Sequence, residues 1–408
     1  MDSMKKIFFI WLLFLSSSLL TAQPKPYVLL ISFDGFRWDY SNRGITPNLQ
    51  KMKDNGVWAS SLQPTYPSKT FPNHYSIITG EYNDHHGIIA NNFTNPFTNK
   101  VYKVGDTTSV RNSKWYLGEP FWTTAERQGI ISASYFWPGS EQHLSYRHPT
   151  YFEIYDHHRQ HKISVKGVLN WLQLPAKKRP HFITLYFHDT DDAGHKYGPN
   201  SAEVNKAIIS LDSVIGLLYN GFEKIGMKDS VNVIIVSDHG MTEIYPEKSI
   251  NIQKMLEGYS YKMEGEKPFV LIKPENNNFD SVYTILKRNE NHYKVYLKKD
   301  MPKYYHYSEN PFIYPIIIVA DLGWSLVNNK WLGSFKLRHS KGNHGYDNHQ
   351  LDMHGTFIAE GPNFRKGYKT GTLWNIDIYP LLCKIFGIEP RANIDGRLDR
   401  IGFILKPQ

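Results

Sequence analysis

The sequence predicts an α/β fold, with a mostly parallel central sheet flanked by helices and a small α+β insertion. The first observation is a set of short, continuous apolar runs, which are typical of strands buried on both faces of a parallel sheet. The second is that segments with helical spacing of apolar residues lie between these runs. The strand-like runs are 26–33, 130–137, 181–187 and 231–236, and the helix-like segments are 121–129, 164–174 and 201–219.

The pattern changes between about residues 250 and 341, where short strand-like and helix-like pieces are flanked by polar runs. We interpret this stretch as the α+β insertion. A last strand at 353–359 and a final helix at 376–386 follow it. A chain of 408 residues suits one large domain. We therefore expect a single domain over 23–408 that contains the insertion.

The composition is that of a globular protein, with 41% hydrophobic and 21% charged residues. The formal net charge is +9, but Lys and Arg are scattered, with only short runs such as 177–179. The sequence therefore does not predict nucleic-acid recognition, whereas a mildly positive field favours small anionic substrates. The single cysteine, Cys383, excludes an intramolecular disulfide and a zinc site built from cysteines.

The first 22 residues have the pattern of a signal peptide, because Lys5 and Lys6 precede an apolar segment and Ala22 offers a small residue for cleavage. No later run is apolar and long enough to span a bilayer. We therefore expect an exported protein, periplasmic or secreted, without a membrane span. We also expect it to be a monomer.

The stretch from Pro67 to His74 holds a candidate nucleophile, Thr70. Pro72 is tolerated in the first turn of a helix, and the residues after it read as the start of a buried helix. Thr70 is therefore expected at a helix N-terminus, where the backbone favours negative charge. Taken alone, such a threonine is most simply a cap. It becomes a good nucleophile when a metal or a base removes its proton.

Acidic residues and histidines follow three of the predicted strands. They are Asp34 after 26–33, one of Asp189, Asp191 and Asp192 with His195 after 181–187, and Asp238 with His239 after 231–236. Because ligands of open α/β sheets bind outside the carboxyl ends of the strands, these side chains are expected to converge on one edge. Spacing alone does not choose among the three aspartates that precede His195.

His344, isolated in a glycine-bracketed turn, brings the number of ligands to what two divalent ions require. Asp and His ligation without cysteine is common in catalytic zinc sites. Two such ions clamp the attacking and leaving oxygens of a phosphoryl displacement. Thr70 would then attack phosphorus, and a neutral donor such as Asn91 would stabilise the developing charge. We interpret His85, His188 and His354 as structural, with His85 and His86 in a loop.

Seven motifs, in order, resemble those of the nucleotide pyrophosphatase/phosphodiesterase family within the alkaline phosphatase superfamily. The likeness runs from about residue 27 to near the C-terminus. The motifs are Ser32-Phe-Asp-Gly-Phe-Arg37, Pro67-Ser-Lys-Thr-Phe-Pro-Asn-His74, His86-Gly-Ile-Ile-Ala-Asn91, Phe136-Trp-Pro-Gly-Ser140, Asp191-Asp-Ala-Gly-His-Lys-Tyr-Gly-Pro199, Ser237-Asp-His-Gly-Met241 and His344-Gly-Tyr-Asp-Asn348.

This resemblance implies an alkaline phosphatase-like fold and a site for two Zn²⁺ ions. It favours Asp191 over Asp189 and Asp192. One ion would be held by Asp191, His195 and His344, and the other by Asp34, Thr70, Asp238 and His239. Thr70 would be the nucleophile, and Asn91 would stabilise the oxyanion.

The resemblance also implies two aromatic contacts to a nucleobase. Phe71 would lie under the base, and Tyr155 would cover its other face, with Tyr151 and Phe152 as alternatives. Stacking of this kind tolerates different bases.

The function implied is that of a secreted two-zinc phosphodiesterase/pyrophosphatase. It would hydrolyse nucleotide phosphodiester or pyrophosphate bonds and release nucleoside 5′-monophosphates through a phosphothreonine intermediate. One alternative is a phospholipid or choline phosphodiesterase, or a phosphomonoesterase, of the same superfamily. Another is a non-catalytic metal-binding surface protein, which the presence of Thr70 and of every ligand disfavours.

Overall fold

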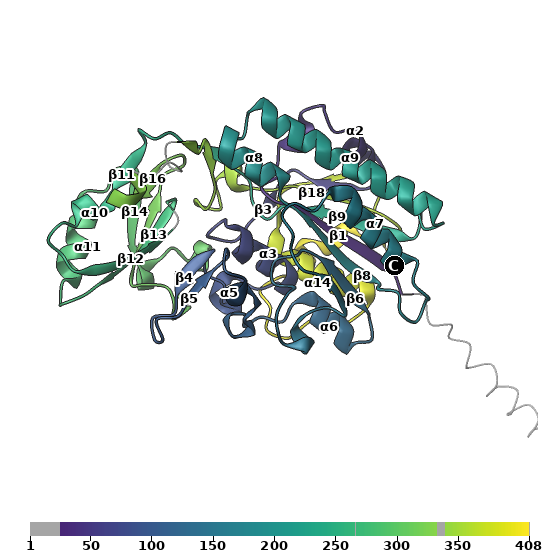
Figure 1. Ribbon diagram of the computed structural model, residues 1–408, viewed down its shortest axis with the longest axis horizontal. Coiled ribbons are helices and arrows are strands. Elements are labelled where there is room, and N and C mark those ends of the chain that lie inside the picture. The colour runs from purple at the N-terminus through teal and green to yellow at the C-terminus, as the bar shows by residue number, and fades with distance from the viewer. Residues whose placement is uncertain (1–24, 266, 333–338, 408) are drawn as a thin grey trace, which may run out of the picture.

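A large twisted sheet with helices on both faces forms the body of the protein (Figure 1). The computed structural model describes residues 25–265, 267–332 and 339–407, so the predicted signal peptide at 1–22 lies outside the described residues. The eight strands follow the order β19-β2-β18-β9-β1-β8-β6-β7. Their bounds are β1 Tyr27–Phe33, β2 Val57–Ala59, β6 Ser132–Tyr135, β7 Tyr151–Glu153, β8 Phe182–Phe187, β9 Val231–Val236, β18 Phe357–Glu360 and β19 Tyr368–Thr370.

Strand β1 lies at the middle of the sheet and pairs in parallel with β8 on one side and β9 on the other. Ser32 of β1 is in register with Tyr186 of β8 and with Val236 of β9. Strand β18 is the exception, since it runs antiparallel to both β9 and β2. The prediction of a mostly parallel central sheet is therefore confirmed.

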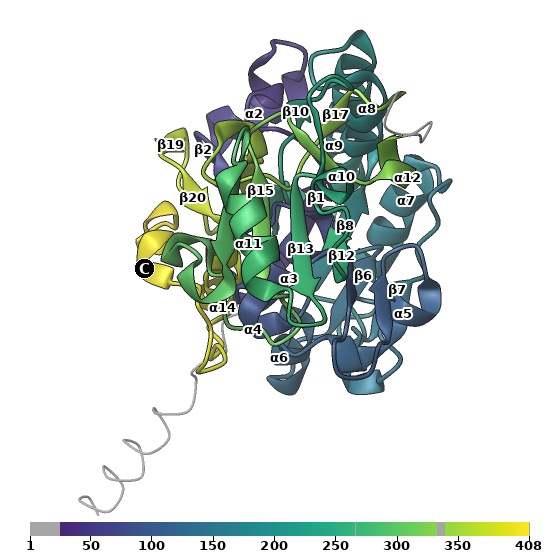
Figure 2. The same cartoon turned by 90° about the vertical axis from the view of Figure 1, so that its left-hand side faces the viewer.

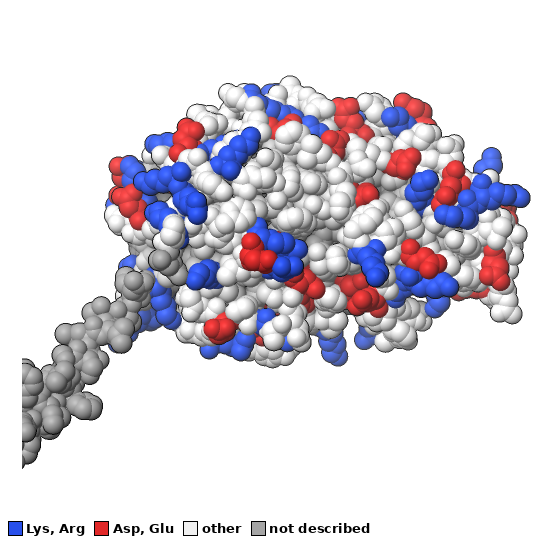
Figure 3. All heavy atoms as spheres, turned by 180° about the vertical axis from the view of Figure 1, so that it is seen from behind, with Lys and Arg blue, Asp and Glu red and all other residues white. Residues whose placement is uncertain are grey.

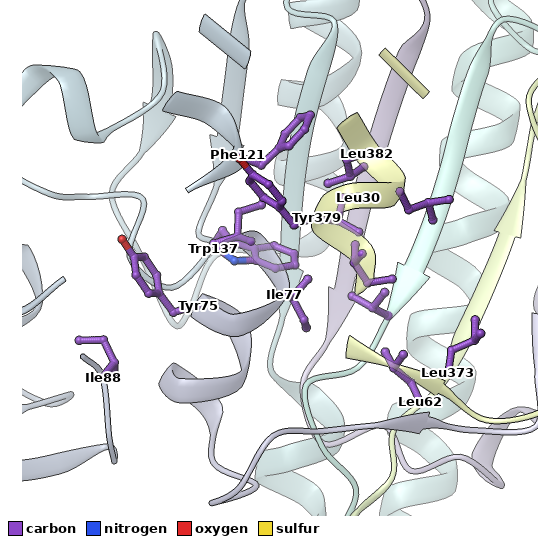
Figure 4. Close-up of a cluster of buried hydrophobic side chains, with 14 of the residues drawn as sticks. Leu30, Leu62, Tyr75, Ile77, Ile88, Phe121, Trp137, Leu373, Tyr379 and Leu382 are labelled. Atoms are coloured by element: carbon purple, nitrogen blue, oxygen red, sulfur yellow. The ribbon is translucent and has the colours of Figure 1, made fainter. Parts of the chain in front are cut away.

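The two faces of β1 belong to two different cores, because successive side chains of a strand point in opposite directions. Val28 and Leu30 join one buried cluster, which Figure 4 shows with Ile77 and Phe121 around Leu30. Leu29 and the other odd-numbered residues of β1 join the second cluster. This burial on both sides explains why the strand reads as an unbroken apolar run.

Helices cover each core. The helices over the first cluster are α3 Thr70–Thr79, α6 Phe121–Arg127 and α14 Ile378–Phe386, and those over the second are α2 Pro47–Asn55, α7 His161–Leu172 and α9 Ala202–Lys224. The long helix α9 and its neighbour α2 lie above the sheet in Figure 1, and α3, α6 and α14 lie below it. Within the described residues, no helix is both apolar and long enough to cross a bilayer.

A second, smaller sheet forms between residues 261 and 320 and projects from one end of the body (Figures 1 and 2). It has four antiparallel strands in the order β12-β13-β15-β14. The elements of this region are β11 Ser249–Asn251, α10 Ile252–Met255, β12 Tyr261–Gly265, β13 Phe269–Pro274, α11 Phe279–Arg288, β14 Tyr293–Leu297, β15 Ile316–Ala320, β16 Ser325–Val327 and α12 Asn329–Leu332.

Both faces of this second sheet are packed. Val270 and Ile272 of β13 lie in a cluster with Val282 and Leu286 of α11. Phe269 and the other residues of the opposite face belong to the main core, where the Phe269 ring lies 6.0 Å from that of Tyr66. The insertion is thus continuous with the hydrophobic core under the stretch that leads to Thr70.

The remaining short elements connect these parts. They are β3 Leu62–Gln63, α4 Asn83–His86, β4 Asn92–Thr94, β5 Val101–Lys103, α5 Thr107–Arg111, α8 Asp189–Tyr197, β10 Thr242–Glu243, β17 Gly342–Asn343 and β20 Leu373–Trp374. On the face opposite to that of Figure 1, basic and acidic residues are interspersed around a broad uncharged area (Figure 3). That face carries no stripe of a single sign.

Three local features were not predicted correctly from the sequence: two differ from an expectation, and for the third, helix α8, no element was expected. His85 and His86 end the short helix α4 instead of lying in a loop, because Asn83 and His86 point inward and Ser76 lies 2.9 Å from His86 Nε2. The last strand begins only at Phe357, after a 3-10 turn that is not visible in an apolar pattern. The acidic segment after β8 forms helix α8, although it has almost no apolar residues.

Replacement of Leu211 by alanine tests the packing of α9 on the sheet. Leu211 is fully buried, so Leu211→Ala is expected to lower the free energy of unfolding by about 2–5 kcal/mol. Leu217→Ala in the same helix is the control, because Leu217 is 48% exposed and should cost little. Urea denaturation of the two variants measures both values. Equal losses would contradict the packing described.

Candidate metal centre and nucleophile

The three acidic strand ends lie side by side, because β9, β1 and β8 are neighbours in the sheet. Asp34 follows β1 and Asp238 follows β9, and both are buried. The backbone N–H of Gly35 donates a hydrogen bond to Asp238 Oδ1 at 3.2 Å, which ties the two strand ends together. From β8, the hydroxyl of Tyr186 donates to Asp34 Oδ2 at 2.6 Å.

Asp34, Asp238 and His239 form a compact group, here called the nucleophile-side group. His239 Nε2 lies 3.4 Å from Asp34 Oδ1 and 3.0 Å from Asp238 Oδ2. The Oγ1 atom of Thr70 lies 3.2 Å from the same Nε2 atom. Four residues from three separate parts of the chain therefore present ligand atoms to one small volume.

Asp191, His195 and His344 form a second group, here called the α8 group. Asp191 Oδ1 lies 3.5 Å from His195 Nε2 and 3.6 Å from His344 Nε2. The two Nε2 atoms are 3.2 Å apart. Asp191 and His195 occupy positions i and i+4 of α8, so the helix places them on one face.

Backbone carbonyls turn the Nε2 atoms of these histidines inward. His344 Nδ1 lies 2.8 Å from the carbonyl oxygen of Ser68, and His195 Nδ1 lies 2.9 Å from that of Gly342. His239 Nδ1 is held in the same way, 2.9 Å from the carbonyl of Gly240. Metal-binding histidines usually have such a partner, because it fixes the tautomer and the ring orientation.

The two groups touch each other. The rings of His239 and His344 are stacked, with centroids 3.5 Å apart and an interplanar angle of 14°. Gly35 brings the backbone of Asp34 close to α8, since it has φ +64° and a Cβ there would lie 2.9 Å from the Cα of Asp191. Only a residue without a side chain permits this approach.

The carboxylates of both groups carry oxygens that are suited to binding a cation. Asp34 Oδ1, Asp191 Oδ1 and Asp238 Oδ2 are buried and have no hydrogen-bond donor among the described residues. Buried polar atoms without partners are rare, and a bound ion is one explanation for them. These three oxygens are the ones that face the histidine Nε2 atoms, so the residues present fit two bound divalent cations.

Electrostatics also indicate a shortage of positive charge. Burial, reinforced by Asp238 and Asp191, raises the pKa of Asp34 well above its usual range. Burial would raise the pKa of Asp238 as well, but His239 and His74 outweigh it and the net shift is downward. Without bound cations, Asp34 therefore holds a proton far more readily than an ordinary aspartate does.

Thr70 is the first residue of α3, as the sequence predicted for its position at a helix N-terminus. The next residue, Phe71, donates its backbone N–H to Asn91 Oδ1 at 3.0 Å. With Oδ1 engaged in this way, the amide nitrogen of Asn91 is the group that can donate to a substrate oxygen. The structure thus places Thr70, Phe71 and Asn91 together.

Tyr155 lies nearer to the two groups than its alternatives do. Its ring centroid is 6.0 Å from that of Tyr186, which hydrogen bonds to Asp34. Burial, followed by the charge of Asp34, raises the pKa of Tyr155. Tyr151 instead donates to the carbonyl of Lys178, and Phe152 packs against His148.

Two supporting residues were missed by reasoning from the sequence. Tyr186 is the second-last residue of β8, and its hydroxyl donates a hydrogen bond to Asp34. His74 lies one helical turn after Thr70, with Nδ1 2.9 Å from the Thr70 carbonyl and 3.4 Å from Asp238 Oδ2. The i+4 spacing of His74 from Thr70 was the available signal, whereas Tyr186 offered none.

The chain is similar to several known proteins. Residues 28–347 match the family described as type I phosphodiesterase / nucleotide pyrophosphatase. Human ectonucleotide pyrophosphatase/phosphodiesterase family member 5 is 36% identical over 374 residues, which cover 91% of this chain and 77% of that protein. Human family member 1 is 35% identical over 396 residues, but the chain spans only 42% of its length.

A solved structure of murine family member 5, in an inactive form and in complex with AMP, has a similar fold. The TM-score is 0.88 at 32% sequence identity, with 94% of this chain and 100% of the other chain covered. This match confirms the predicted fold class.

The substitution Asp34→Asn tests the electrostatic argument. Because the raised pKa means that ionisation of Asp34 disfavours folding, the variant should raise the free energy of unfolding of the chelator-treated protein at pH 7.5. The difference should shrink as the pH falls, since wild-type Asp34 then takes up its proton. Urea denaturation at several pH values measures it.

The control for this experiment is Asp229→Asn, which changes an exposed carboxyl and should have no such effect. Added zinc should stabilise the wild type and stabilise Asp34→Asn less, because the variant lacks one anionic ligand. A metal-free Asp34→Asn protein that is less stable than the wild type would refute the argument.

Proposed function

Because the chain belongs to the type I phosphodiesterase / nucleotide pyrophosphatase family, we propose that it hydrolyses nucleotide phosphodiester or pyrophosphate bonds and releases nucleoside 5′-monophosphates. The observation that carries the proposal is the position of Thr70. Its hydroxyl lies at the N-terminus of α3, 3.2 Å from His239, and five further candidate ligands complete the two groups. A hydroxyl so placed is suited to attack an anionic phosphorus centre.

Two zinc ions are the proposed cofactors. Asp191, His195 and His344 would hold one ion, and the nucleophile-side group with Thr70 would hold the other. Oxygen and imidazole ligands without cysteine suit zinc in a catalytic site. Bound zinc would supply positive charge that lowers the pKa of the Thr70 hydroxyl and offsets the charge of the phosphate.

Hydrolysis would proceed in two steps. Thr70 Oγ1 gives up its proton to solvent and forms a bond to phosphorus as the bond to the leaving oxygen breaks, which gives a phosphothreonine and the first product. Water then attacks the same phosphorus and loses a proton to solvent. The bond from phosphorus to Thr70 Oγ1 breaks, Thr70 takes up a proton again, and nucleoside 5′-monophosphate leaves. Asn91 donates a hydrogen bond from its side-chain amide to a non-bridging phosphate oxygen in both steps.

Phe71 and Tyr155 are the proposed contacts to the nucleobase. Phe71 is half-buried, packs on the main core and lies beside the nucleophile, so it offers a supported aromatic surface. Tyr155 is 41% exposed and lies next to Tyr186 of β8. Aromatic stacking recognises a nucleotide without selecting strongly among bases.

The relatives favour a nucleotide substrate over the alternatives. The complex of murine family member 5 with AMP contains a nucleoside monophosphate, which is the product class proposed for this chain. A choline or lipid phosphodiester, or a phosphate monoester, would be accepted by the same nucleophile but would not use the aromatic contacts. We further propose that the protein is exported, in keeping with its predicted signal peptide. We also propose that it acts as a monomer.

Replacement of the nucleophile is the main test. Thr70→Ala is expected to lower kcat for a chromogenic nucleoside 5′-monophosphate ester by about a thousand-fold or more, since no other residue replaces a lost nucleophile. Thr70→Ser, which keeps a hydroxyl, is the matched control and should retain part of the activity. Treatment with a chelator should abolish the activity of the wild type, and zinc should restore it.

The same assay compares the nucleotide ester with the corresponding choline ester and with the phosphate monoester. Turnover of only the choline ester or the monoester would show that the substrate belongs to the alternative class. Thr70 would remain the proposed nucleophile. Absence of turnover on all three substrates by the zinc-loaded wild type would leave the chain as a non-catalytic metal-binding protein.

Removal of the Phe71 ring tests the nucleobase contact. Phe71→Ala should reduce kcat/KM for the nucleotide ester by roughly 5- to 150-fold, which corresponds to the loss of one stacking contact of about 1–3 kcal/mol. Turnover of a small phosphodiester without a base should fall much less. Phe97→Ala is the control, because Phe97 is 73% exposed in the turn that joins β4 and β5. Equal losses for both substrates would reject the stacking role.

A further inference from the structure

A third cluster of possible metal ligands lies beside the two central groups. It consists of His157, His188 and Asp192 and is here called the rim cluster. The Nε2 atoms of His157 and His188 lie 3.2 Å and 3.6 Å from Asp192 Oδ2. One ligand atom of each residue lies within 4.8 Å of the others. Nothing in the proposed reaction uses these three side chains.

The two separations to Asp192 are close to those of a tetrahedral zinc site. Zinc binds imidazole nitrogen and carboxylate oxygen at about 2.0–2.2 Å, which places neighbouring ligand atoms about 3.3–3.6 Å apart. The two measured separations to Asp192 fall in or next to this range. A cation could therefore enter with only small movements of the side chains.

Tyr155 orients both imidazoles. Its hydroxyl lies 2.9 Å from His157 Nδ1 and 3.4 Å from His188 Nδ1. The two rings are stacked, with centroids 3.9 Å apart and an interplanar angle of 24°, so both turn their Nε2 atoms the same way. A hydroxyl oxygen has two lone pairs and can accept both Nδ1–H groups, which fixes the tautomer that leaves each Nε2 free to bind a cation.

The rim cluster is separate from the α8 group, although Asp191 and Asp192 are adjacent in sequence. Successive residues of a helix point about 100° apart, so α8 directs Asp191 to the central site and Asp192 to the rim. The side chains of His157 and Asp192 are 46% and 54% exposed, respectively. A cation held here would keep coordination positions open to water or to a substrate oxygen.

We propose that the rim cluster binds a third divalent cation of the zinc type. The cation would fasten His157, which lies in the loop after β7, to α8 and so hold Tyr155 in place at the edge of the active site. The cation site itself is independent of the proposed function. Only the inference that the cation holds Tyr155 at the edge of the active site rests on the proposed function.

The number of bound ions tests the proposal without any measure of activity. Untagged protein is equilibrated with a series of buffered free zinc concentrations, and the zinc retained per chain is measured by mass spectrometry. The wild type is expected to bind three zinc ions at saturation. His157→Ala should bind two, and Asp192→Asn should bind the third ion more weakly.

His158→Ala is the matched control, because His158 is the exposed neighbour of His157 and lies outside the cluster. It should bind three ions. Circular dichroism of each variant verifies that the fold is kept. A saturating count that is the same for wild type and His157→Ala overturns the proposal.

The proposed function and the rim cation can fail separately. Asp34→Asn should remove zinc from the central site and leave the third ion in place. If the nucleotide ester is not hydrolysed but His157→Ala still loses one ion, only the proposed function fails. If hydrolysis is intact and His157→Ala loses none, only the rim cation fails.

Discussion

The parallel pairing of β1 with both β8 and β9 is the constraint on which the rest of the structure depends. Each of these strands ends at the same edge of the sheet, so Asp34, Asp191 and Asp238 reach one place although they are far apart in sequence. The hydrogen bonds between the backbones of these strands determine the position of this edge. The helix that starts at Thr70 then needs only to present its first turn to this edge.

The buried carboxylates at this edge of the sheet lower the stability of the metal-free protein. Buried carboxylates are stabilised by donors, and the chain supplies some of them through Tyr186 and the backbone of Gly35. Three carboxylate oxygens still have no donor among the described residues. The fold thus retains negative charge without hydrogen-bond donors, which lowers its stability. Such a loss of stability is common where a functional site is preorganised.

Much of the architecture could be read from the sequence, because the central strands are buried on both faces and appear as unbroken apolar runs. The family resemblance is confirmed by the match over residues 28–347, and the mostly parallel sheet by the strand pairing. The assignment of roles to individual site residues stays a prediction. The structure adds that these residues do lie in two adjoining groups.

Other features of the site could not be predicted from the sequence because they depend on tertiary contacts. Helix α8 begins with four consecutive polar residues and contains a glycine, so its conformation depends on its neighbours and not on an apolar stripe. Tyr186 looks like any aromatic residue of a buried strand until its partner across the sheet is known. His188 resembles a structural histidine until the loop after β7 brings His157 beside it.

The insertion shares its hydrophobic contacts with the chain that precedes the nucleophile. The rings of Tyr305 and Tyr307 lie 4.6 Å and 5.2 Å from that of Tyr66, which is four residues before Thr70. A protein engineer who exchanges this module for that of a relative would therefore also disturb the support of Thr70. Chimeras should be joined so that the aromatic residues around Tyr66 come from a single parent.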